Sequence, residues 1–214
     1  MKKRLVSVLC IVLLVTLVLS GCGKSEKDAL IGKWNGVMDA TDYLNQVMGA
    51  EDPVVGQYMQ VSDFSIRYVI TFNEDDTYSL KVDRAAFDVT VDNLMDEIEA
   101  GVMAYLEDEI KNAGLDMTVD ELLEASGISI DALMEESFPD GVFDDVIESM
   151  EMEGKFKVDD GKLMLSESLS TIPDPAVYER YTLDGDKLTI EQGTAEVDEV
   201  EGFNVYPMVL KKAG

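Results

Sequence analysis

The chain lacks the side chains on which the commonest catalytic and metal sites depend. It has no histidine among its 214 residues, which excludes histidine-based triads and zinc sites with imidazole ligands. Its two cysteines, Cys10 and Cys22, both stand at the start of the chain. This position excludes a disulfide framework, a four-cysteine metal site and a cysteine nucleophile in the body of the protein.

Carboxylates are the abundant reactive groups, with 44 Asp and Glu against 17 Lys and Arg and a formal charge of −27. A pair of carboxylates can hydrolyse a glycoside without histidine. In so acidic a chain, however, suitable spacings occur everywhere and none is diagnostic. Neither G-x-S-x-G nor S-x-x-K occurs, so the usual serine-hydrolase signatures are absent. We expect no enzymatic activity and keep a carboxylate-dependent hydrolase only as an unfavoured alternative.

The acidic composition also bears on metals and nucleic acids. Asp-rich turns occur at 159–161 and 184–186, but neither has the spaced oxygen ligands and final glutamate of a calcium loop. We interpret both as hairpin turns and expect no metal ion or other cofactor. Nucleic acid is not expected as a partner, since its phosphates require Lys and Arg. Because 46% of the residues are hydrophobic, the chain is too apolar for a disordered acidic protein.

The beginning of the chain has the pattern of an export signal. A basic start at residues 2–4 precedes an apolar run over 5–19. This run is short for a membrane span, which needs about 20 residues, and fits the apolar core of a signal peptide. The sequence Leu19-Ser20-Gly21-Cys22 then resembles the lipobox of bacterial lipoproteins, in which the cysteine is lipidated and becomes the new N-terminus.

This resemblance implies a location for the protein. We expect a signal peptide over 1–21, a lipidated tether over 22–29 with Cys22 as the lipidation site, and a membrane partner reached through the lipid anchor. The domain would stand on the extracytoplasmic face of the cell membrane. A conventional secretory signal with an incidental cysteine is the disfavoured alternative.

Residues 30–90 and 151–214 show the two-residue alternation of β-strands. One apolar face in the first stretch is formed by Phe64, Ile66, Tyr68, Ile70 and Phe72, and continues after a turn with Tyr78, Leu80 and Val82. Two later hairpins surround the turns at 159–161 and 184–186, and a last strand is expected near 203–210. We count about eight short strands joined by tight turns, which favours an antiparallel barrel or sandwich.

Residues 91–150 change to the three- and four-residue spacing of amphipathic helices, and Thr118 opens a capping box. This segment holds eighteen acidic residues and one base, Lys111. We interpret it as an acidic α-helical lobe inserted into one β-domain, which makes the fold class α+β. Two separate domains are disfavoured, because residues 30–90 alone supply too few strands to be stable.

The order of motifs resembles that of lipocalin-like lipoproteins of Gram-positive bacteria. Gly32-Lys33-Trp34 matches their opening G-x-W, and strand–Asp-Gly–strand hairpins such as 181–188 follow. The resemblance implies a lipocalin-like, calycin-type β-barrel, with Gly32 and Trp34 as barrel-closing structural residues beneath a late base, Lys211 or Lys212. The chain departs from the family pattern by its helical insertion and by lacking a late arginine. Because this family is largely uncharacterised, the resemblance implies no activity.

These observations favour a non-enzymatic lipoprotein with a binding or protein-interaction role at the cell envelope. A basic protein could bind the acidic helices, although a solvated helix face is the commoner reason for such charge. Alternatively, the barrel could carry a small neutral apolar ligand. The expected interior is bulky, since it includes Phe64, Ile66, Tyr68 and Phe72, and it favours a filled barrel over a cavity. Scarce arginines disfavour an anionic ligand more than a neutral or cationic one. The oligomeric state stays open.

The lipid anchor is directly testable. We expect a Cys22→Ala precursor to lose all labelling by a radioactive fatty acid, because the thiol that would form the thioether is absent. The measurement is metabolic labelling followed by immunoprecipitation, with a Cys10→Ala precursor as the control that keeps its label. Labelling that persists in the Cys22→Ala protein would contradict the assignment.

Overall fold

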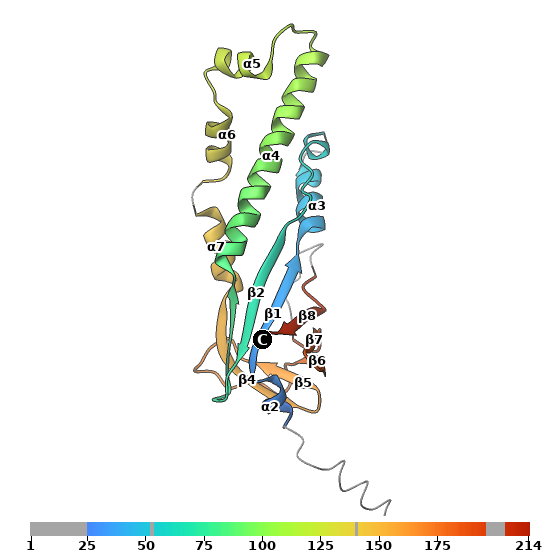
Figure 1. Cartoon of the computed structure of the whole chain (residues 1–214), viewed down its shortest axis with the longest axis vertical. Coiled ribbons are helices and arrows are strands. Elements are labelled where there is room, and N and C mark those ends of the chain that lie inside the picture. Colours follow the sequence, from blue (N-terminus) through green and yellow to red (C-terminus); the bar gives the residue numbers. More distant parts are fainter. Residues whose placement is uncertain (1–24, 52–53, 140, 196–203) are drawn as a thin grey trace, which may run out of the picture.

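The computed structural model describes residues 25–51, 54–139, 141–195 and 204–214. Its eight strands form one closed antiparallel barrel in chain order, in which each strand pairs with the next and the last returns to the first (Figure 1). The strands are β1 (Gly32–Asp39), β2 (Ser65–Phe72), β3 (Thr77–Val82), β4 (Met152–Asp159), β5 (Lys162–Leu165), β6 (Glu179–Asp184), β7 (Lys187–Glu191) and β8 (Met208–Lys212). The α+β class and the expected eight-stranded antiparallel barrel are confirmed.

One helix precedes the first strand, and the others occupy connections between strands. They are α2 (Glu26–Leu30), α3 (Thr41–Glu51), α4 (Arg84–Asn112), α5 (Val119–Ser126), α6 (Ile130–Ser137) and α7 (Val142–Met150), with a short 3₁₀ helix at Val55–Gln57. Helices α4 to α7 stand between β3 and β4, and α4 extends far beyond the barrel (Figure 1). The Asp83 side chain caps α4 directly after β3 by accepting from the amide of Ala86. The helix therefore begins before the expected boundary between residues 90 and 91, which falls inside it.

The two ends of the barrel are connected differently. The turns between β2 and β3, β4 and β5, and β6 and β7 are tight and lie at one end, which we call the turn end. A left-handed backbone occurs in each of them, at Asp76, at Asp160 and Gly161, and at Gly185, as is common in tight hairpin turns. The long connections, which include α3, α4–α7 and residues 166–178, leave from the opposite end, the loop end.

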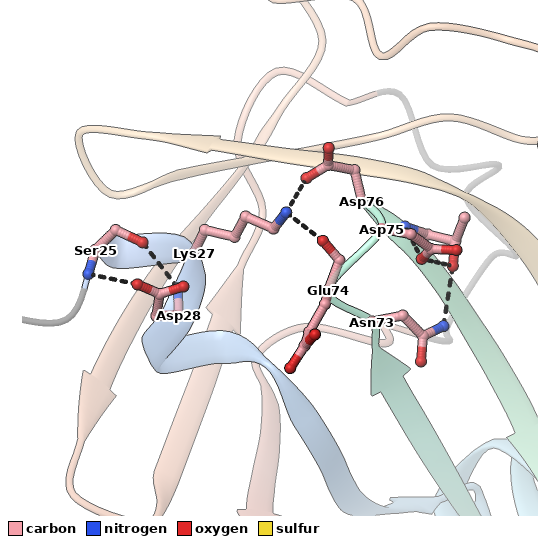
Figure 2. A network of polar contacts seen from close by, with 8 residues as sticks. Ser25, Lys27, Asp28, Asn73, Glu74, Asp75 and Asp76 are labelled. Atoms are coloured by element: carbon pink, nitrogen blue, oxygen red, sulfur yellow. Dashed lines mark hydrogen bonds and ion pairs between the residues drawn. The ribbon is translucent and has the colours of Figure 1, made fainter.

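Helix α2 covers the turn end. The side chains of Ser25 and Asp28 form a capping box, and Leu30 is fully buried in the barrel core. The Lys27 ammonium donates to the carbonyl oxygen of Glu74 and pairs with Asp76 in the turn between β2 and β3 (Figure 2). We expected a tether over residues 22–29. The structure instead places residues 26–30 in a helix that packs on the barrel. Residues 22–24 of that expected tether lie outside the described residues.

The molecule has two apolar cores. One fills the barrel, and the other lies where the outer parts of β1 and β2 pack against α4 and α7. Phe64 and Ile66, which we expected inside the barrel, belong to this second core, and the Phe64 ring meets Phe87 of α4 at a centroid distance of 6.1 Å. The reason is that β1 pairs with β2 over its whole length but with β8 only from Trp34 to Gly36.

Gly154 of β4 allows a close backbone approach. A Cβ atom placed there would lie 1.9 Å from the carbonyl oxygen of Ser166, so Gly154→Ala must displace main chain. We expect the substitution to lower the free energy of unfolding by about 1–3 kcal/mol, measured by urea denaturation. Gly49→Ala is the matched control, because nothing lies within 4 Å of that added atom. Equal stability of the Gly154→Ala and unsubstituted proteins would contradict this packing.

Candidate ligand site

A cavity of about 440 Å³ lies inside the loop end of the barrel. Its volume falls within the range of small-molecule sites, roughly 300–1,000 Å³. All eight strands contribute to its wall, together with the end of α7 and the segment before β8. The lining side chains are Met38, Tyr68, Ile70, Phe72, Tyr78, Leu80, Ser149, Met150, Met152, Leu163, Leu165, Glu179, Ile190, Val205, Tyr206 and Met208.

The sequence favoured a filled barrel, and the structure shows a barrel that is filled at one end only. Near the turn end Trp34, Phe72 and Phe156 are almost completely buried, and the rings of the last two meet edge to face at 4.9 Å. Two of the bulky residues counted for the interior, Phe64 and Ile66, instead pack against α4. Fewer large side chains are therefore left for the loop end, where the cavity remains.

Three tyrosines bring hydroxyl groups to this mostly apolar wall. The Tyr78 hydroxyl donates to the carbonyl oxygen of Ser166 at 3.0 Å, and the Tyr206 hydroxyl donates to Oε1 of Glu179 at 3.3 Å. Burial raises the pKa of Tyr68 and of Tyr78 to about 12. Both hydroxyls therefore stay protonated at physiological pH; the Tyr78 proton is already donated to Ser166, whereas the Tyr68 hydroxyl can act as a neutral hydrogen-bond donor toward a bound molecule.

Among the described residues, Glu179 is the only charged side chain in the cavity wall, and 9% of its surface is exposed. It stands at the start of β6, where its register partner on β5 is the apolar Leu163. No ion pair to Glu179 forms within the described ranges. Burial raises the pKa of this carboxyl, although its own backbone amide and the Tyr206 hydroxyl oppose the shift. A buried carboxylate without a cation is costly, which marks Glu179 as a candidate functional residue.

Sequence reasoning did not single out Glu179 or Tyr206. The signal for Glu179 was present, because alternation backward from Leu183 and Tyr181 places it on the same inward face. Tyr206 precedes β8 and reaches Glu179 across 27 positions of sequence. No local pattern predicts that contact.

The residues singled out from the sequence lie at the other end of the barrel. Trp34 is fully buried, and its indole nitrogen donates to the carbonyl oxygen of Leu30 at 2.7 Å. The Lys212 ammonium lies 4.8 Å from the centre of the Trp34 ring and donates to the carbonyl oxygen of Ala29. Gly32 has a φ of +123° and lies beside the Lys212 side chain. These residues meet at the turn end, away from the cavity, and Cys22 lies outside the described residues.

Other kinds of site find less support in the described part of the chain. Within residues 25–51, 54–139, 141–195 and 204–214, no three Asp, Glu or Cys side chains gather as a metal site would require. None of the helices in these ranges combines the length and hydropathy needed to cross a membrane. Comparison with protein-family models, with curated proteins and with solved structures finds no match to this chain.

The buried carboxylate predicts an unusual dependence of stability on pH. Because the pKa of Glu179 is raised in the folded state, its protonated form favours folding, and this contribution is lost as the pH rises through the folded-state pKa. We expect Glu179→Gln, which keeps an acceptor for Tyr206, to raise the free energy of unfolding by about 1 kcal/mol at pH 7. The gain should shrink as the pH falls through the raised folded-state pKa and vanish below about 4.5, the ordinary pKa of this carboxyl.

The measurement is urea denaturation of both proteins at neutral and acidic pH. Glu191→Gln is the control, because Glu191 is exposed on β7 and the loss of its charge should change the free energy of unfolding little. A Glu179→Gln protein that is less stable than the unsubstituted protein at pH 7 would show that the carboxylate has a stabilising partner.

Proposed function

We propose that this chain is a lipid-anchored extracytoplasmic lipoprotein with a lipocalin-like barrel that binds a small apolar ligand. The observation that carries the proposal is the cavity of about 440 Å³ at the loop end, with its largely apolar wall. Closed eight-stranded barrels are suited to hold one small ligand. The proposed function is binding without chemistry on the ligand, and among the described residues that line the cavity Glu179 is the one carboxylate.

The geometry supports a particular orientation at the membrane. Ser25 and α2 lie at the turn end, so an anchor at Cys22 would hold that end toward the lipid. The cavity mouth and α4–α7 would then point away from the membrane. The acidic residues concentrated in the helices, with Lys111 as the one base in 91–150, favour the same orientation because bacterial membranes are mostly anionic.

The acidic helices support a second candidate, the docking of a basic protein. Helix α6 has no fully buried residue. Elsewhere in the segment from α4 to α7, Leu115, Ile128 and Val146 are exposed. Burial of such a helix against a partner would remove apolar surface from water. We rank this candidate below ligand binding, since a solvated acidic face needs no partner.

A native mass measurement tests the ligand. We expect the intact protein, taken from the bacterial envelope without denaturation, to carry an excess mass that leaves when the protein unfolds. Met208→Trp should remove that mass, because Met208 lines the cavity and an indole would occupy its space. Val209→Trp is the matched control, since the neighbouring Val209 is about half exposed on the barrel surface, and this variant should keep the ligand.

Two results would contradict the proposal. A bare mass for the unsubstituted protein would mean that the barrel holds no ligand in the envelope. The same excess mass in both variants would place the ligand outside the cavity. An added mass of protein size would instead support the docking of a partner.

A further inference from the structure

The chemistry of the cavity wall bears on the class of ligand. Resting on the proposed function, we propose that the barrel selects an amphiphile with a cationic amine, whose apolar body fills the cavity and whose ammonium group binds the Glu179 carboxylate. In the cavity wall, apolar side chains surround one acidic group, and no basic group is present among the described residues.

Glu179 has spare capacity for a ligand. A carboxylate offers about four lone-pair positions to donors. The side chain of one other residue, Tyr206, donates to Glu179 in the described part of the chain, at 3.3 Å. The neighbouring Arg180 is exposed and follows in the strand, so alternation directs it to the outer surface. An ammonium group in the cavity could therefore reach the carboxylate without displacing a cation of the protein.

The charge of the ligand decides how well it fits this wall. An ammonium would give Glu179 a charge-assisted hydrogen bond in a site of low dielectric, where such bonds are strong. A neutral ligand would leave the carboxylate unpaired, and an anionic ligand would be repelled by it. The rings of Tyr68 and Tyr78 in the same wall add electron-rich surfaces that attract a cation. The charge-assisted hydrogen bond and the aromatic rings both favour the cationic amphiphile over a neutral or anionic ligand.

A structural role for Glu179 is the competing explanation. The bond from Tyr206 to Glu179 links the segment before β8 to the start of β6, and its purpose could be to hold that segment on the barrel. This explanation predicts that neutralising Glu179 changes stability without changing which ligand binds. Ligand preference is therefore the readout that separates the two explanations.

The experiment uses three probes of one length and three charges: octylamine, 1-octanol and octanoate. Octylamine is protonated at neutral pH, as a lysine side chain is. We expect the intact protein to bind octylamine roughly tenfold more tightly than 1-octanol, in line with one charge-assisted hydrogen bond, and to bind octanoate most weakly. Isothermal titration calorimetry measures each affinity.

Three variants identify the group responsible. Glu179→Gln should bind octylamine roughly tenfold more weakly while its affinity for 1-octanol changes less than about twofold. Glu191→Gln removes an exposed carboxylate one strand away and should keep the preference for the amine. Tyr206→Phe removes the donor but leaves the carboxylate, so it should keep the preference as well.

Each outcome decides a separate point. Equal affinity for octylamine and 1-octanol, unchanged in Glu179→Gln, would overturn the selectivity for amines while the binding of apolar ligands stands. Loss of the preference in Tyr206→Phe as well as in Glu179→Gln would assign it to the pair and overturn the carboxylate as the sole determinant. Failure of the folded protein to bind any of the three probes would overturn the proposed function together with this inference.

Discussion

The short pairing between β1 and β8 is the constraint on which the rest of the structure depends. These strands close the barrel over three register pairs, and the pairing ends at Gly36, although β1 continues to Asp39 beside β2. Toward the turn end from Gly36, the interior is filled around Trp34. Toward the loop end, β1 and β2 leave the barrel as a two-stranded ribbon whose apolar face packs against α4. Phe64 and Ile66 on that face are lost to the barrel interior, whereas Met38 of β1 still lines the cavity that remains there.

The turn end is held mainly by burial, and its ion pair adds little. Lys27 and Asp76 make a close contact, but both side chains are substantially exposed, and such pairs contribute about 0–1 kcal/mol. Full burial of a leucine such as Leu30 contributes about 1.5–3 kcal/mol. The Lys212 ammonium over the Trp34 ring adds a further attraction of about 0.5–2 kcal/mol. Because Leu30 and Lys212 come from opposite ends of the described chain, this end of the barrel joins the two termini of the domain.

The parts of this fold that follow from local sequence are those in which neighbouring residues determine the structure. Alternation and Asp-Gly turns predict the hairpins, and the capping box at Thr118 predicts the start of α5. The place where β1 and β2 leave the barrel is different in kind. Phe64 and Ile66 alternate in phase with Tyr68. Alternation predicts that their face is buried, but it does not predict whether strands of the barrel or a helix cover that face. The cavity was unpredictable for the same reason, because it depends on side chains that are drawn away to another core.

The burial of the Glu179 carboxylate costs folding free energy, and this cost is what suggests a role in binding. Its inward direction follows from alternation, yet a carboxylate is the least favourable group to place in an apolar wall. If the barrel only had to be filled, glutamine would keep the acceptor for Tyr206, and leucine would add apolar contacts, in either case without a buried charge. Both alternatives avoid the desolvation that raises the pKa of this carboxyl. A ligand that supplies the missing cation would remove that disadvantage in the bound state alone, so binding and folding stability would be linked. The proposed ligand would thus give the carboxylate the cation that the described part of the protein does not supply.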